Sequence, residues 1–265
     1  MSKTALITGG SSGLGLAMAE QLAERGYRLI LIARDELKLQ AAKASIQKSH
    51  SDCDVAVYSC DIGDTEKLGQ TFQQISDNYS SIELLVINAG VATINLVRDY
   101  PDVSIITNNL QVNLIAAITT AYFAMPLLKP GARMLFISSG FAFLGPAGYS
   151  LYAAAKGGMN NFAEAMRREM RSRQVSVHVA CPGDIDTPMY HGELEIMPEW
   201  MKKKMGRAKP KSAHSVADYI LRRCLAGKYW IIPSSDVRMV LWMQRLLPRS
   251  LVLWIVDRLL PLPDA

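Results

Sequence analysis

The stretch that decides the fold is Thr8-Gly9-Gly10-Ser11-Ser12-Gly13-Leu14-Gly15, which joins a short apolar run to a helical pattern. Glycine permits positive φ angles and lets a backbone approach a phosphate closely. The helix that follows offers free N–H groups and the positive end of its dipole to an anion. The spacing G-x-x-x-G-x-G differs from G-x-G-x-x-G, but strand, turn and helix follow in the order that a pyrophosphate-binding turn requires. A plain tight connection is the alternative interpretation.

Short apolar runs alternate with helical patterns on both sides of this turn. We expect strands over 5–8, 29–33, 55–59, 84–88, 134–138 and 175–180, and helices over 14–25, 36–48, 67–78, 105–128 and 152–173. Runs that are apolar throughout are typical of strands buried on both faces, and helices between them imply right-handed crossovers. The pattern predicts an α/β fold with a doubly wound parallel sheet, the Rossmann fold. We expect a single domain over 1–235 and a helical C-terminal extension over 236–265.

Composition narrows the class of protein. Hydrophobic residues make up 49% of the 265 residues and charged residues 20%, which favours a packed core over disorder. The four cysteines form no C-x-x-C pair and the four histidines form no H-E-x-x-H cluster, so we expect reduced thiols and no metal site. The apolar run before Gly9 is too short for a secretory signal or a membrane span. A cytoplasmic protein is expected.

The end of the second predicted strand bears on the cofactor. The strand ends at Ala33, and Arg34 and Asp35 follow. In dinucleotide sites an acidic residue here accepts a hydrogen bond from the ribose 2′-hydroxyl, whereas an arginine accommodates a 2′-phosphate. Arg34 therefore favours NADP(H) over NAD(H), although Asp35 places a negative charge next to it. A solvated surface arginine is the alternative.

A possible catalytic group lies at the start of the last core helix. Tyr152 and Lys156 are spaced i and i+4, so they share one helical face. A nearby ammonium lowers the pKa of a phenol and makes it usable in acid–base catalysis. Ser139 ends the fifth strand, where ligands bind in such sheets. Neighbouring Ser138 points to the opposite side of the strand, so the spacing selects Ser139.

Taken together, these motifs resemble the short-chain dehydrogenase/reductase family. The resemblance covers residues 3–190 and is carried, in family order, by Thr8-Gly9-x-x-x-Gly13-x-Gly15, Asp61-Ile62, Asn88-Ala89-Gly90, Asn113, Ser139, Tyr152-x-x-x-Lys156 and Pro182-Gly183-x-Ile185-x-Thr187. It implies an oxidoreductase that moves a hydride between NADP(H) and a carbonyl/alcohol pair. A homo-oligomer built on the long helices is also implied.

The resemblance assigns catalytic roles to four residues. Tyr152 would be the acid–base group, and Lys156 would lower its pKa and bind the nicotinamide ribose. Ser139 would orient the substrate, and Asn113 would hold a water in a proton relay. Asn113 could instead be only a polar residue that bends its helix.

The resemblance also implies a set of cofactor contacts. Asp61 and Ile62 would contact the adenine, and Ile185 and Thr187 the nicotinamide carboxamide. The full set that would bind NADP(H) is Thr8, Gly9, Ser11, Ser12, Gly13, Leu14, Gly15, Arg34, Asp61, Ile62, Asn88, Ala89, Gly90, Tyr152, Lys156, Pro182, Gly183, Ile185 and Thr187. The segment Asn88-Ala89-Gly90 could instead mainly stabilise the sheet.

The C-terminal quarter differs from the rest of the chain. Residues 197–265 hold 13 of the 29 Lys and Arg but 5 of the 24 Asp and Glu. The resemblance implies a substrate-covering loop over 188–212, and its Met and aromatic residues indicate an apolar pocket wall or, alternatively, ordinary helix packing. Residues 237–260 predict two short Leu-, Trp- and Arg-rich helices split at Pro248. This pattern suits a membrane surface better than a span, with a pocket cover or a subunit contact as alternatives.

Three function classes remain at this point. The leading hypothesis is a reductase or dehydrogenase for a bulky or lipid-like ketone, because of the apolar C-terminal quarter and a loose similarity to the 3-ketodihydrosphingosine reductase branch. A catalytically idle nucleotide sensor or scaffold is the alternative, but it has no need of Ser139, Tyr152 and Lys156. A nucleic-acid binder is disfavoured because the C-terminal arginines alternate with Leu and Trp rather than forming a basic stripe.

Overall fold

Parallel strands form a seven-stranded central sheet in the computed structural model, which describes residues 3–205 and 209–259. The strand order is β3-β2-β1-β4-β5-β6-β9. The strands are β1 Thr4–Thr8, β2 Arg28–Ala33, β3 Val55–Ser59, β4 Leu84–Ile87, β5 Arg133–Ile137, β6 Ser176–Ala180 and β9 Trp230–Ile231. The predicted doubly wound parallel sheet is confirmed. Its edge strand β9 was not expected, because two paired residues leave no readable pattern.

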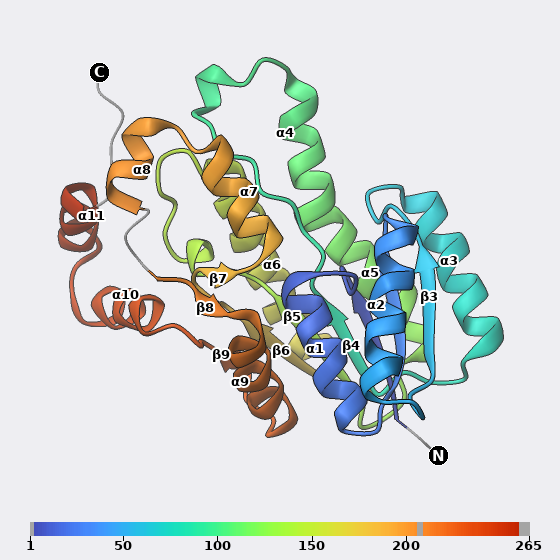
Figure 1. The fold of residues 1–265 in the computed structure, drawn as a ribbon. Coiled ribbons are helices and arrows are strands. Elements are labelled where there is room, and N and C mark those ends of the chain that lie inside the picture. Colours follow the sequence, from blue (N-terminus) through green and yellow to red (C-terminus); the bar gives the residue numbers. More distant parts are fainter. Residues whose placement is uncertain (1–2, 206–208, 260–265) are drawn as a thin grey trace.

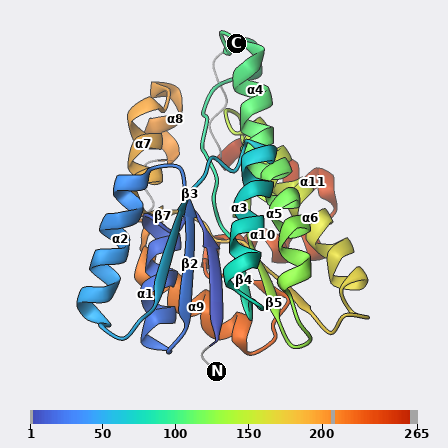
Figure 2. The ribbon, with the colours of Figure 1, turned by 90° about the vertical axis from the view of Figure 1, so that its right-hand side faces the viewer.

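Helices cover both faces of this sheet (Figures 1 and 2). One face carries α1 Gly13–Glu24, α2 Glu36–Ser49 and α9 Ala213–Leu225, whose apolar sides share a buried cluster with β1 and β2. The other face carries α3 Thr65–Asn78, the α4–α5 run and α6 Ser150–Glu169. Aspartates cap several of these helices, as where Asp35 accepts a hydrogen bond from the N–H of Lys38. Because the strands are parallel, their C-termini all meet along one edge of the sheet.

The helix predicted over 105–128 is interrupted. It consists of α4 Val103–Leu110, a π-helical turn over Gln111–Ile115, α5 Ala116–Ala124 and a short 3₁₀ turn. The π-helical turn contains Asn113, whose side chain is bonded to the backbone of the neighbouring loop. The whole run, Val103–Leu127, is long and apolar enough by composition to cross a bilayer. Its core-facing alanines, such as Ala116 and Ala121, pack against the sheet instead.

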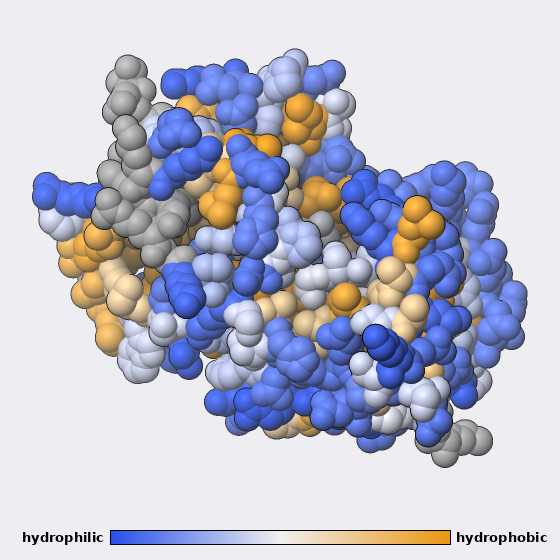
Figure 3. Space-filling view, in the orientation of Figure 1, coloured by the Kyte–Doolittle hydropathy of each residue, from blue (hydrophilic) through white to orange (hydrophobic). Residues whose placement is uncertain are grey.

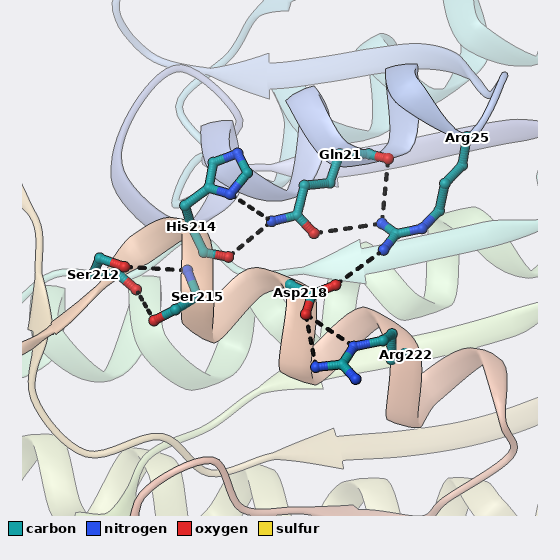
Figure 4. Close-up of polar contacts among 7 residues, drawn as sticks. All are labelled: Gln21, Arg25, Ser212, His214, Ser215, Asp218 and Arg222. Atoms are coloured by element: carbon teal, nitrogen blue, oxygen red, sulfur yellow. Dashed lines mark hydrogen bonds and ion pairs between the residues drawn. The ribbon is translucent and has the colours of Figure 1, made fainter.

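Helix α9 is held against α1 by polar contacts (Figure 4). Gln21 donates a hydrogen bond from Nε2 to the carbonyl oxygen of His214 at 2.8 Å, and Arg25 pairs with Asp218 at 3.3 Å. Asp218 is also paired with Arg222 on its own helix. These bonds fix the helix that precedes β9, and thereby the last strand of the sheet.

The remaining elements are two helices and a small sheet in the segment that follows β6, and two helices at the C-terminus. Helices α7 Pro188–Ile196 and α8 Glu199–Met205 form the predicted substrate loop, and a two-stranded sheet pairs β7 Ile185–Asp186 with β8 Lys211–Ser212. The C-terminal extension forms α10 Ser235–Leu246 and α11 Arg249–Leu259, separated at Pro248 as expected. Residues 206–208 of the predicted loop and 260–265 of the predicted extension lie outside the described residues.

Candidate active site

A cleft of about 610 Å³ opens at the carboxyl ends of the strands. It collects residues from the glycine turn, from the ends of β2 through β6 and from α7 and α10. The predicted site residues that line it are Gly9, Ser11, Ser12, Gly13, Leu14, Arg34, Asp61, Ile62, Asn88, Ala89, Gly90, Ser139, Tyr152, Lys156, Pro182, Gly183, Ile185 and Thr187. Thr8, Gly15 and Asn113 do not line it.

Thr8 and Asn88 hold the glycine turn from behind. The Thr8 hydroxyl accepts hydrogen bonds from the N–H groups of Asn88 and Ala89, at 3.0 and 3.2 Å. In return the Asn88 amide donates to the carbonyl oxygens of Thr8 and Gly9, at 3.0 and 3.4 Å. These bonds join the ends of β1 and β4. The Asn88 side chain therefore stabilises the sheet, which is the alternative role that the sequence left open for this segment.

Two glycine positions of the turn have no room for a side chain. Gly13 has a φ of +53°, and a Cβ there would lie 3.2 Å from the Thr187 side chain. A Cβ on Gly15 would collide with the carbonyl oxygen of Gly9. Backbone therefore lines the floor of the cleft next to the N-terminus of α1, a cradle that suits a pyrophosphate. The chain segment that ends in Thr187 closes this cradle from the other side.

Two cations line the cleft just after the end of β2. Arg34 and Lys38 both line it and are exposed. The Asp35 carboxylate accepts a hydrogen bond from the N–H of Lys38 at 3.0 Å and lies 3.6 Å from its Nζ. The Asp35 carboxylate, which follows Arg34 in the sequence, is thus engaged in capping α2 and in pairing with Lys38. Sequence reasoning missed Lys38, although its place three residues after a capping aspartate puts it at the start of α2.

The sheet edge and α6 bring three predicted catalytic residues together. Lys156 is 3% exposed, and its Nζ donates a hydrogen bond to the carbonyl oxygen of Ile137 at 2.9 Å. The same Nζ lies 5.6 Å from the centre of the Tyr152 ring. Ser139, directly after β5, faces Tyr152, and its Oγ accepts a hydrogen bond from the N–H of Phe141 at 3.2 Å. Ser138 is turned to the carbonyl oxygen of Lys156, as the strand alternation predicts.

Removal from water dominates the acid–base properties of this group. Burial raises the pKa of Tyr152, the negative charge of Glu193 adds to the rise, and the Ser139 hydroxyl opposes it. Burial lowers the pKa of Lys156 to about 8. The sequence leads us to expect a lowered pKa for the phenol, whereas the shift runs the other way. Tyr152 therefore stays protonated at neutral pH, which suits a proton donor.

Asn113 lies beside the cleft and not in it. Its amide nitrogen donates to the carbonyl oxygen of Val91 at 2.8 Å and to the Asn109 side chain at 3.2 Å. Its Oδ1 accepts a hydrogen bond from the N–H of Val91 at 3.0 Å. A Cβ on Gly90 would meet that oxygen at 2.7 Å. Both N–H groups of the Asn113 side-chain amide thus donate to protein acceptors. These bonds hold the 90–91 loop in place beside Lys156.

Further polar residues that sequence reasoning did not select line the same cleft. Tyr149 donates a hydrogen bond from its hydroxyl to Oε2 of Glu193 at 3.0 Å. Partial burial raises the pKa of Glu193 to about 7, against the lowering effect of the Tyr149 hydroxyl. Asp184 and Asp236 also line the cleft, and the pKa of Asp184 is raised by burial and by Asp236. No short motif marks these residues, because they come from four separate places in the chain.

Helix α10 forms part of the cleft wall. Val237 packs where a Cβ on Gly140 would lie, and Gln244 donates a hydrogen bond to the carbonyl oxygen of Phe143 at 2.7 Å. The cleft lining that α10 and α11 supply consists of Asp236, Val237, Met239, Val240 and Leu259. The extension therefore covers the pocket, which is one of the alternatives that the sequence leaves open.

The predicted substrate loop contributes both to the cleft wall and to helix packing, the two interpretations that the sequence left open. Met189 and Tyr190 line the cleft, as a pocket wall would. Met197 and Met201 are buried instead in a small cluster with Ile94 and Tyr149. That cluster packs the loop onto the start of α6.

Comparison with known proteins identifies the family. The family model for short chain dehydrogenases matches residues 3–196. An Arabidopsis thaliana 11-beta-hydroxysteroid dehydrogenase-like 4A is 29% identical over 94% of this chain and 82% of its own length. The Arabidopsis 3-dehydrosphinganine reductase TSC10A is 34% identical over 75% of this chain and 60% of its own length. The chain belongs to the short-chain dehydrogenase family of oxidoreductases, which act on alcohol and carbonyl groups.

Solved structures agree with the fold. A short chain dehydrogenase from Burkholderia cenocepacia in complex with NADP is 25% identical, with a TM-score of 0.77 over 89% of this chain and 98% of that one. A Burkholderia phymatum short chain dehydrogenase/reductase in complex with NAD is 18% identical, with a TM-score of 0.82 over 100% of this chain and 98% of that one. Both nicotinamide cofactors thus occur among structural neighbours of this chain.

Proposed function

We propose that this protein is an NADP(H)-dependent oxidoreductase that interconverts a ketone and an alcohol, with Tyr152 as its acid–base group. One observation carries the proposal. Tyr152, Lys156 and Ser139 line the same cleft as the glycine turn, so one bound dinucleotide could reach from the turn to the phenol. A catalytically idle scaffold has no use for a buried lysine beside a tyrosine, because burying a charge is costly. We therefore favour turnover over an idle sensor.

The residues of the chain divide the work of reduction among them. When bound, NADP(H) supplies the hydride. Ser139 holds the carbonyl oxygen with its hydroxyl, and Tyr152 donates a proton to that oxygen. Lys156 supplies a positive charge beneath the phenol and a donor for the ribose. Holding these groups in place before reaction removes most of the entropic cost of bringing them together.

Residues along the cleft support the proposed cofactor. The glycine cradle would hold the pyrophosphate, and Arg34 with Lys38 would hold a 2′-phosphate. Asp61 and Ile62 would contact the adenine, and Ile185 and Thr187 the carboxamide. We prefer NADP(H) over NAD(H) because Asp35, the carboxylate that follows Arg34 in the sequence, is already paired with Lys38.

We propose a bulky, apolar or lipid-like ketone as the substrate. The cleft beside Tyr152 is lined by the apolar side chains Phe141, Leu144, Met189, Val237, Met239, Val240 and Leu259. Two relatives are named for large apolar compounds, a steroid and dehydrosphinganine. Residues 1–235 would form the catalytic domain, and 236–265 an extension that covers the pocket.

We also propose that α10 and α11 rest on a membrane surface. Large apolar side chains are exposed on them, namely Met239, Trp242, Leu246, Leu251, Leu253, Trp254 and Leu259. In Figure 3 hydrophobic residues gather at the left edge, over the place of α11 in Figure 1. Arginines accompany them, and the Arg258 guanidinium lies 4.3 Å from the Trp254 ring centre. Apolar residues interleaved with arginines suit anionic lipid headgroups.

We further propose a homo-oligomer built on the α4–α5 run. Val103 and Tyr122 are 69% and 63% exposed there, although both are large and apolar. Sedimentation of the purified protein tests this, and a monomer at micromolar concentration would contradict it.

The activity is tested by NADPH oxidation with ketones of graded chain length, with NADH alongside. The proposal expects rates that rise with chain length and that are higher with NADPH. Equal or better rates with NADH would remove the role given to Arg34 and Lys38. The absence of turnover with every ketone would favour the idle sensor.

A further inference from the structure

One side of helix α10 is fixed to the body of the protein. Val237, Val240 and Gln244 are spaced three and four residues apart, so they share this side of the helix. Val237 is buried against Gly140, and Gln244 donates its hydrogen bond to the carbonyl oxygen of Phe143. Val237 and Val240 also line the cleft. These contacts hold α10 in place as a wall of the cleft.

The opposite side of α10 is apolar and exposed. Met239, Trp242 and Leu246 have the same spacing of three and four residues, and all three are exposed. Met239 is 57% exposed and nevertheless lines the cleft. A side chain with both properties stands at the rim of the cleft. The exposed apolar side of α10 therefore extends to that rim.

Helix α11 supplies a second residue of this kind. Val252 is buried, and Leu259 lies seven positions later on the same side of the helix. Leu259 lines the cleft, yet it is 66% exposed. The two helices lie next to each other at one side of the molecule (Figures 1 and 2). Within the described part of the chain, the cleft thus has an apolar rim that includes Met239 and Leu259.

The charges around this rim suit an anionic lipid surface. The charged residues of α10 and α11 are all exposed, and they are Arg238, Arg245, Arg249 and Arg258 against Asp236 and Asp257. A net positive surface attracts anionic headgroups. The exposed indoles of Trp242 and Trp254 belong to a residue type that is enriched at the boundary between headgroups and acyl chains. A bilayer bound by these helices would therefore bring its acyl chains to the rim.

A second hollow adjoins the cleft. It measures about 350 Å³, is lined by α7 and residues 90–92, and shares Met189 and Glu193 with the cleft. Ile196 lines this hollow but not the cleft, and it is 58% exposed. No arginine and no tryptophan is found among the described residues that line the hollow. It lacks the features that would attract anionic lipid, so it suits approach from water.

We propose that the rim at Met239 and Leu259 is the entrance through which an apolar ketone passes from a lipid bilayer directly into the cleft. This inference rests on the proposed function and names the source of the substrate. A long apolar chain that leaves a bilayer through water must expose its whole apolar surface, which is unfavourable. A rim of apolar side chains in contact with the acyl chains avoids that exposure.

The test gives one long-chain ketone to the full-length protein in two ways. The ketone is either embedded in vesicles of anionic phospholipid or carried in water by cyclodextrin. We compare kcat/KM for the two deliveries as a ratio, because a change inside the cleft affects both deliveries and cancels. Met239→Gln/Leu259→Gln places two amides on the rim. We expect the ratio of vesicle to water delivery to fall by about tenfold, since the amides must lose contacts with water when a lipid chain passes.

Ile196→Gln is the matched control. It makes the same kind of change at an equally exposed residue, but in the hollow beside α7. The ratio should stay at the wild-type value in this variant. Flotation with the same vesicles is measured alongside, and the double variant should still bind them, because Trp242 and Trp254 are retained.

The outcomes separate this inference from the proposed function. A double variant that keeps the wild-type ratio would overturn the inference and leave the activity standing. An equal fall in Ile196→Gln would also overturn it, because any exposed apolar residue would then have the same effect. Loss of flotation by the double variant would give the two residues a docking role in place of an entrance. A wild-type protein that turns over no ketone would overturn the inference and the proposed function together.

Discussion

The ammonium of Lys156 lies 5.6 Å from the centre of the Tyr152 ring and is bonded to the carbonyl oxygen of Ile137 at 2.9 Å. A lysine that is 3% exposed would ordinarily not be retained for stability, because its charge is removed from water. Its placement beneath the phenol gives it a use in the cleft.

Lys156→Met should change how stability depends on pH. Burial lowers the pKa of Lys156 from 10.5 to about 8, so between these values the unfolded chain binds more protons than the folded one. Wild-type stability therefore gains a contribution that rises with pH from about 8 to 10.5, and the methionine variant lacks it. Thermal melts across this range measure the difference. Lys129→Met, at an exposed site, should keep the wild-type slope, and a matching slope in Lys156→Met would contradict the prediction.

Arg34→Ala and Lys38→Ala should each weaken NADPH binding by about tenfold and leave NADH binding nearly unchanged. The reason is that only NADPH carries the 2′-phosphate that these cations would face. Titration of each protein with both cofactors, followed by cofactor fluorescence, measures the effect. Lys48→Ala is the control, because Lys48 lies in α2 but does not line the cleft. Equal losses for NADH and NADPH would refute this assignment.

Asn88→Ala should destabilise the protein by about 1–3 kcal/mol, because it removes two donors from the carbonyl oxygens of Thr8 and Gly9. NADPH affinity should fall with it, since the glycine turn loses its support. Urea unfolding measures the first effect. Asn78→Ala removes one exposed hydrogen bond within α3 and should cost little. A cost no larger than that of Asn78→Ala would show that the turn holds itself.

The double variant Trp242→Ala/Trp254→Ala should lose binding to vesicles of anionic phospholipid while keeping its fold. These indoles are 61% and 54% exposed, so their removal creates no cavity. Substitution is preferable to truncation near Ser235, because Val237 belongs to the cleft wall. Flotation with anionic and with neutral vesicles measures binding. Leu37→Ala, at an 82% exposed leucine on α2, is the control, and equal flotation of all three proteins would contradict membrane docking.

The sequence predicted the parts of this fold that repeat a simple pattern. Strands such as Leu29–Ala33 are apolar throughout, which predicts a parallel sheet buried on both faces. The glycine turn follows the first strand, which predicts a cleft at the carboxyl ends of the strands. The π-helical turn at Asn113 was not predictable, because it depends on bonds to Val91, 22 residues away. Strand β9 is two residues long and leaves no period to read.

The site divides in the same way. Tyr152, Lys156 and Ser139 were found because a fixed spacing joins them. Glu193 carries no local motif, since its partner Tyr149 is distant in sequence and only packing brings the two together. The direction of the Tyr152 pKa shift was also missed, because burial dominates that shift and burial cannot be read from a spacing.

The most direct test of the central claim compares Tyr152→Phe with the wild-type protein in NADPH-dependent reduction of a long-chain ketone. The substitution removes one hydroxyl from the cleft, so we expect kcat to fall by about a hundredfold to ten-thousandfold while NADPH binding stays nearly intact. Tyr122→Phe, at an exposed tyrosine on α5, should have no effect. A Tyr152→Phe protein that keeps half of its activity would contradict the account.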